Sequence, residues 1–157
     1  AVALEFFNIS SVRIGALLRD YSHVNKFELT PAFFIGHKEI DADHAALVSL
    51  LNKMVDAYMA EDLTACHDKW QQFCHKLEIH FATEVAIMQK FKFRESAGHE
   101  EEHQEIIKIA KSLGEGCTTL GGWETCLFTM RDSLLSLILK RDLKFAEHLV
   151  TIGYNRV

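Results

Sequence analysis

Histidine and carboxylate side chains recur at four-residue spacing in the middle of this sequence. His80 and Glu84 are four residues apart, and so are His99 and His103. In a helix, residues i and i+4 lie on one face, so each pair can present two donor atoms to the same ion. The spacing therefore indicates chelation of metal ions, provided that both pairs lie on helices.

Helices are the elements that the rest of the sequence predicts. Proline occurs only at Pro31, and after it the apolar residues recur at helical spacing over most of the remaining length. Four long helices are expected, with short connections that make neighbours antiparallel, so the fold class is all-α, an antiparallel up-down-up-down four-helix bundle with an N-terminal arm. The expected helices run from Asp41 to about Ala60, from Asp62 to about Lys90, from a cap at Ser96 to a break that begins at Gly114, and from about Trp123 to His148.

The domain organisation follows from length and regularity. The 157 residues fit one domain, with residues 1–33 as the arm and 34–157 as the bundle, and one short helix is expected in the arm from about Val12 to Asp20. The four cysteines, at positions 66, 74, 117 and 126, form no C-x-x-C pair and no dense framework. They are expected to be reduced, mostly buried thiols rather than a disulfide scaffold or zinc ribbon.

Charge and hydropathy exclude several classes of partner. A formal charge of −5 argues against a general nucleic-acid binder, which would carry a basic face. The chain contains no run of eighteen apolar residues, so no membrane partner is expected. The segment from Ala1 to Asn8 lacks the features of a signal peptide, and a cytoplasmic location is favoured.

Polar residues interrupt the apolar inward face of every predicted helix. The first helix places His44 inward and the last places Asp142 inward, so all four helices contribute at one level of the bundle. Buried imidazoles and carboxylates cost several kcal/mol unless something satisfies them. The candidate metal ligands are His44, His80, Glu84, His99, His103 and Asp142.

This donor set is too large for one ordinary zinc site. A tetrahedral zinc ion takes four ligands, whereas two carboxylates that each bridge can hold a pair of divalent ions. Nitrogen and oxygen donors without a nearby thiolate suit iron, manganese or zinc. Iron is favoured, with zinc next. The alternative without a metal site is a helical bundle whose inward histidines are satisfied by hydrogen bonds.

The ordered motifs resemble those of hemerythrins and bacteriohemerythrins. The resemblance covers roughly Phe34 to Leu149, and each motif falls on a different predicted helix. The segments that carry it are Ile40-Asp41-Ala42-Asp43-His44 with Leu47, His80-Phe81-Ala82-Thr83-Glu84, His99-Glu100-Glu101-Glu102-His103, and Ile138-Leu139-Lys140-Arg141-Asp142 with Phe145 and Ala146.

The resemblance implies a pair of iron ions bridged by Glu84, by Asp142 and by an oxo or hydroxo group. The implied terminal ligands are two histidine pairs, His44 with His80 on one iron and His99 with His103 on the other. In the family the second iron has a third histidine, five positions before the bridging aspartate.

Leu137 occupies the position of that third histidine. Leucine cannot ligate a metal, and His148 cannot replace the lost ligand because it lies about 16 Å further along the helix axis. Water, hydroxide or a small anion is therefore expected at the vacated position. The other histidines are expected away from the metal: His75 lies about 140° round the helix from His80, and His23, His37 and His67 are expected at the surface.

The resemblance also implies reactivity with dioxygen, which the family binds reversibly at an open iron position. With two histidines on each iron, both ions could accept an exogenous ligand, which favours quick oxidation over stable carriage. The favoured function is an oxygen or redox sensing domain of a larger bacterial signalling protein. Its expected partners are dioxygen, another small diatomic molecule or an anion, and a signalling output domain in the same polypeptide.

Two other functions remain open. One is an oxygen carrier or store, against which Leu137 counts. The other is a diiron oxidase or peroxidase, although a ferritin-like enzyme would need two E-x-x-H motifs and only the segment from Glu100 to His103 has that spacing. A sensor or carrier is favoured over an enzyme.

Overall fold

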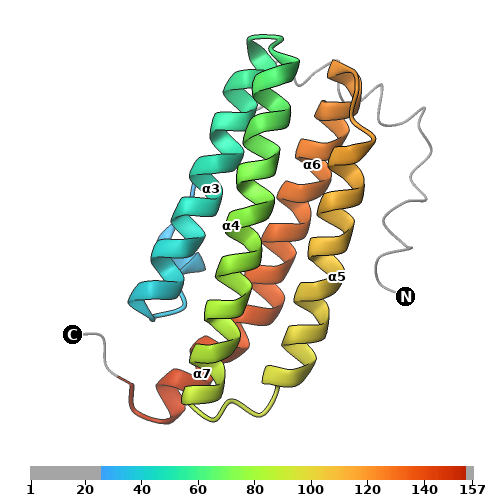
Figure 1. Ribbon diagram of the computed structural model, residues 1–157. Coiled ribbons are helices and arrows are strands. Elements are labelled where there is room, and N and C mark those ends of the chain that lie inside the picture. Colours follow the sequence, from blue (N-terminus) through green and yellow to red (C-terminus); the bar gives the residue numbers. More distant parts are fainter. Residues whose placement is uncertain (1–25, 155–157) are drawn as a thin grey trace.

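The computed structural model describes residues 26–154, and every element within that range is helical. Four long helices pack antiparallel in up-down-up-down order (Figure 1). The expected all-α bundle is therefore confirmed. The elements are η1 (Pro31–Phe33), α3 (Lys38–Met59), α4 (Leu63–Lys90), α5 (Ser96–Glu115), α6 (Leu120–Leu137), a π-helical turn η2 (Ile138–Asp142) and α7 (Leu143–Thr151).

Helix α3 begins earlier than the sequence predicts. It starts at Lys38 with His37 as its N-cap, so Asp41 is already inside the first turn. The Asp41 carboxylate accepts hydrogen bonds from the backbone N–H groups of Ile35 (2.7 Å) and Gly36 (3.2 Å). Asp41 therefore holds the preceding loop against the helix instead of capping it.

The other helix ends follow the prediction more closely. Asp62 caps α4 as expected, because its side chain accepts the backbone N–H of Ala65 at 2.9 Å. Ser96 is the first residue of α5 and Glu95 is the N-cap. The predicted last helix is divided, because the five-residue π turn η2 separates α6 from α7.

Two apolar clusters fill the bundle above and below the level of the predicted ligands. The upper cluster lies toward the α3–α4 and α5–α6 connections and includes Trp70, Phe73 and Trp123. The lower cluster lies at the opposite end and includes Met88 and Phe145. Along α3, along α4 and along the chain from α6 to α7, the predicted ligands lie between residues of the two clusters, which exclude solvent from both ends.

Close approach of α4 and α5 at the upper end depends on a glycine. Gly114 was expected in the break after the third helix, but it is buried inside α5. A Cβ atom added at Gly114 would lie 2.2 Å from Nε1 of Trp70, which donates a hydrogen bond to the carbonyl oxygen of Ala110 at 3.0 Å. Glycine is therefore the residue that fits here.

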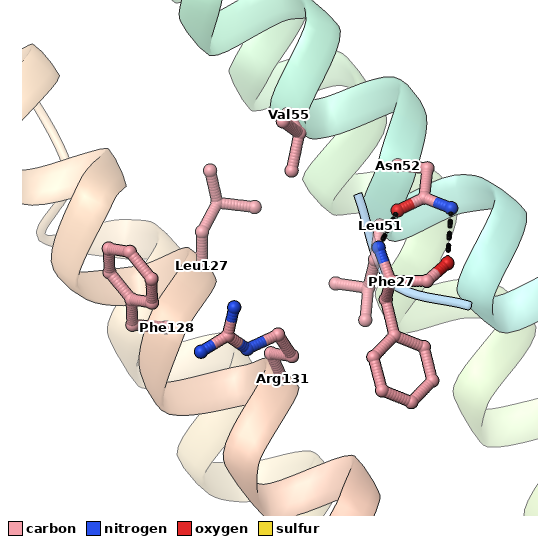
Figure 2. Close-up of a pocket in the computed structure, with 7 residues that line it drawn as sticks. All are labelled: Phe27, Leu51, Asn52, Val55, Leu127, Phe128 and Arg131. Carbon is pink, nitrogen blue, oxygen red and sulfur yellow. Dashed lines mark hydrogen bonds between the residues drawn. The ribbon is translucent and has the colours of Figure 1, made fainter. Parts of the chain in front are cut away.

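Residues 26–30 precede η1, and Lys26 and Phe27 contact α3. The backbone N–H of Phe27 donates to Oδ1 of Asn52 (2.8 Å), and Nδ2 of Asn52 donates back to the carbonyl oxygen of Phe27 (2.9 Å). Phe27 lines one side of a small cavity between α3 and α6, into which the guanidinium of Arg131 extends (Figure 2). The short helix predicted from Val12 to Asp20 lies outside the described residues.

The cysteines divide into two kinds. Cys66 and Cys74 are free and buried, as expected. Cys117 and Cys126 form a disulfide, so the prediction of reduced thiols is wrong for this pair. The α5–α6 connection returns Cys117 to the early turns of α6, a proximity that a separation of nine residues does not reveal. Among residues 26–154, no helix combines the length and apolar character that a bilayer crossing needs.

Candidate metal centre

The structure brings all six predicted ligand residues into one cluster. Each is buried, with at most 5% of its surface exposed. The cluster divides into two groups of four that share Glu84 and Asp142, and within each group the potential donor atoms lie within 4.8 Å of one another. The remaining members are His44 and His80, here the first half-site, and His99 and His103, here the second half-site.

Each oxygen of Glu84 faces a different half-site. Oε2 lies 2.8 Å from Nε2 of His80 and 3.5 Å from Nε2 of His44. Oε1 lies 2.8 Å from Nε2 of His99 and 3.4 Å from Nε2 of His103. The carboxylate therefore spans the two histidine pairs.

Asp142 spans the cluster in the same way from the last turn of η2. Its Oδ2 lies 3.0 Å from Nε2 of His44, and its Oδ1 lies 2.8 Å from Nε2 of His99. Two carboxylates that each offer one oxygen to either side could bridge two cations.

Many polar atoms of this cluster have no hydrogen bond, although they are fully buried. Such atoms are rare in folded proteins and costly, so their number here calls for an explanation. Several lie close to a possible partner without hydrogen-bond geometry, as expected where lone pairs converge on a cation. The unpartnered atoms are Nε2 of His44, His80 and His103, Nδ1 of His44 and His103, Oε2 of Glu84 and Oδ2 of Asp142.

The electrostatics of the cluster favour an ionised Glu84. Burial alone would raise its pKa, but the surrounding histidines outweigh burial and hold the pKa of Glu84 well below its usual range. Burial lowers the pKa of His44 and His99, but the carboxylates of Asp142 and Glu84 outweigh it and raise both pKa values to about 9. For His103, burial prevails and the pKa is lowered. A cation would therefore compete with protons for His44 and His99.

His80 has a carboxylate partner on its far side. Oδ2 of Asp43 lies 3.1 Å from Nδ1 of His80, and Nζ of Lys76 lies 2.8 Å from Oδ1 of Asp43. Burial alone would raise the pKa of Asp43, but Lys76 and His80 lower it overall. A proton held on Nδ1 leaves the Nε2 lone pair of His80 free to ligate a metal.

The contact of Asp43 with His80 is a feature of the cluster that the sequence did not reveal. Asp43 lies within the motif that ends at His44, but as the neighbouring residue it lies about 100° round the helix from that ligand. Only the packing of α3 against α4 brings it to His80.

The second half-site is supported differently. The ring of His103 stacks on Phe81, with centroids 3.7 Å apart and planes 3° apart, and its Nδ1 has no hydrogen-bond partner. Leu137 is buried and belongs to the upper apolar cluster. Residues five apart are about 140° apart in an α-helix, but the π turn brings them toward one side, and both Leu137 and Asp142 are buried.

The other histidines lie away from the cluster. His75 and His67 are exposed, as predicted. Nε2 of His148 lies 2.7 Å from a backbone carbonyl oxygen at the end of α4, which accounts for its polar contact without a metal. His37 is half-buried at the start of α3 rather than at the surface, and His23 lies outside the described residues.

Two comparisons show which known proteins this chain is similar to. The family model described as the hemerythrin HHE cation binding domain matches residues 36–147, a range that contains all six cluster residues. The bacteriohemerythrin of Ralstonia nicotianae (strain ATCC BAA-1114 / GMI1000) is 32% identical over 82 residues, which is 52% of this chain. The match spans 57% of the length of that relative.

Proposed function

Because the chain belongs to the family of the hemerythrin HHE cation binding domain, we propose that its buried cluster binds two iron ions and reacts with dioxygen in a sensing or regulatory role. The fold, the buried cluster and the family together support cation binding. The choice of iron, the number of ions and the sensing role are the proposal.

The observation that carries the proposal is the division of each carboxylate between two histidine pairs. Glu84 and Asp142 each direct one oxygen to the first half-site and the other to the second. One ion would leave part of this donor set unsatisfied and buried, whereas two ions use all of it. Imidazole and carboxylate donors without a thiolate suit iron.

The residues of the chain would prepare the site in distinct ways. His44 and His80 would hold one iron, and His99 and His103 the other, with solvent or a small anion in the place that Leu137 cannot fill. The two apolar clusters exclude bulk water from the centre. Bound iron would supply the redox chemistry and the open coordination positions at which dioxygen reacts.

Two histidines on each ion favour oxidation of the ions over storage of oxygen, and this supports a sensor whose partner is a signalling output domain. An oxygen carrier is the second candidate, because the apolar clusters on both sides would limit proton access to the centre.

Metal content and reaction kinetics test the proposal together. Purified protein should contain about two iron ions per chain, and one tightly bound zinc ion per chain would overturn it. Stopped-flow mixing of the ferrous protein with dioxygen should give direct conversion to the ferric state. A long-lived spectrum that reverses when oxygen is removed would instead favour a carrier.

A further inference from the structure

A surface groove of about 440 Å³ between α4 and α5 leads to the second half-site. Its walls come from both helices and include Val85 and Ala86 of α4 and Ile107 of α5. His103, one of the predicted ligands, also lines the groove, although only 1% of its surface is exposed. The groove therefore ends directly behind an imidazole of the metal centre.

Phe81 forms the inner end of this groove together with His103. Phe81 is 2% exposed and its ring is stacked on His103. The stacked pair separates the groove from Glu84 and the other ligands. A displacement of the Phe81 ring would extend the groove toward the other predicted ligands.

The cavity between α3 and α6, unlike the groove, is not lined by any of the six predicted ligands (Figure 2). Its lining consists of Phe27, Leu51, Asn52, Val55, Leu127, Phe128 and Arg131. Phe27, whose backbone is hydrogen-bonded to Asn52, lines one side of it. This cavity offers no comparable approach to a ligand.

The carboxylates beside the groove favour the entry of uncharged molecules over anions. Glu78 and Glu100 line it, and Glu78 is paired with Lys111. Glu100 has no ion pair among residues 26–154. An uncompensated carboxylate lowers the local concentration of anions and leaves that of neutral molecules unchanged.

We propose that the α4–α5 groove is the route by which small neutral molecules of the class of dioxygen and nitric oxide reach the second half-site, past the stacked pair of Phe81 and His103. This inference rests on the proposed iron centre. Ala82 and Ala86, both exposed on the α4 wall, keep the route wide.

Filling the groove tests the route. Ala82→Trp and Ala86→Trp place large rings in it, and Ala45→Trp is the matched control at an exposed alanine of α3. The bimolecular rate of nitric oxide binding to the iron-loaded protein should fall about tenfold in the first two variants and stay unchanged in the control. Equal rates in all three variants with full iron would overturn the route but not the iron centre.

A metal-free measurement separates the route from the proposed function. Ile107→Cys introduces a thiol at the groove wall, and its labelling by methyl methanethiosulfonate can be compared with that of the parent protein. Adding Ala86→Trp should slow this labelling, whereas adding Ala45→Trp should not. Labelling unaffected by Ala86→Trp would overturn the route even in protein that binds no iron.

Two further variants test the inner end of the groove and the charge of Glu100. Phe81→Leu removes the stacked ring and should raise the rate of nitric oxide binding. Glu100→Gln should speed azide binding at low ionic strength and leave nitric oxide binding unchanged. If azide and nitric oxide respond equally to Glu100→Gln, the selection for neutral molecules is wrong.

Discussion

The two half-sites share both carboxylates but differ in what lies behind their histidines. In the first half-site, His80 is held by Asp43, which is itself paired with Lys76. In the second, His103 rests on the ring of Phe81 and adjoins a groove. The resemblance to hemerythrins implies that Leu137 replaces a histidine ligand there. If each half-site holds one ion as proposed, the first should retain its ion more firmly and the second should be the more accessible of the two.

The sharing of the Glu84 carboxylate by both half-sites is tested by removing it. Glu84→Ala removes the oxygen that each half-site receives from α4, so we expect both ions to bind at least about 100-fold more weakly. Loss of a residue that only hydrogen-bonds to a ligand typically lowers metal affinity by about 10–100-fold. Iron per chain after gel filtration measures the loss. Glu101→Ala, at an exposed position of α5, is the control and should keep its iron. A Glu84→Ala protein with full iron would show that Glu84 is no bridge.

Removing one terminal ligand should affect one half-site more than the other. His103→Ala leaves the second half-site with one histidine, whereas the first keeps His44, His80 and both carboxylates. We expect about one iron ion per chain to remain. The count and the loss of spectroscopic coupling between the two ions provide the measurement. Loss of both ions would show that the half-sites do not fill independently.

Asp43→Asn tests the support of the first half-site. The neutral amide oxygen is a weaker acceptor than a carboxylate for the Nδ1 proton of His80, so metal affinity there should fall about 10–100-fold. Competition with a chelator measures the affinity of each ion. Asp56→Asn is the matched control, because Asp56 is an exposed α3 carboxylate paired with Lys26. Equal affinities in both variants would remove the main difference between the half-sites.

The features that could be predicted from the sequence are those with helical periodicity. His80 with Glu84 and His99 with His103 share a face by spacing alone, and inward His44 and Asp142 follow from the apolar rows around them. The structure brings all six residues together. Their role as ligands remains a prediction that the metal analyses above will test.

Features that depend on packing between helices could not be predicted. Asp43 reaches His80 only across α3 and α4, and the Cys117–Cys126 disulfide forms only because the α5–α6 connection folds back. The sequence predicted that Gly114 begins a break between helices, but this residue is buried in α5 beside Trp70. A glycine has the same sequence signature whether it ends a helix or permits a close contact.

The π turn is the clearest example of a local feature without a sequence signal. Five residues separate Leu137 from Asp142, and a regular helix would place them on different sides. The turn η2 adjusts the phase so that both are buried. Position 137 is therefore still oriented toward the interior, although its side chain cannot ligate.

Leu137→His provides the finest test of the difference between the half-sites. An imidazole at this position would return a third nitrogen to the second half-site, and oxidation of the ferrous protein by dioxygen should slow by a few-fold. Leu134→His is the matched control, because Leu134 is equally buried and lies one turn earlier in α6. Both substitutions bury a polar ring, which costs stability unless the ring finds a partner. Iron should restore thermal stability to Leu137→His but not to Leu134→His, since only the former can ligate. Equal recovery in the two variants, with unchanged oxidation rates, would mean that position 137 does not adjoin the metal and that the second half-site owes its openness to the groove alone.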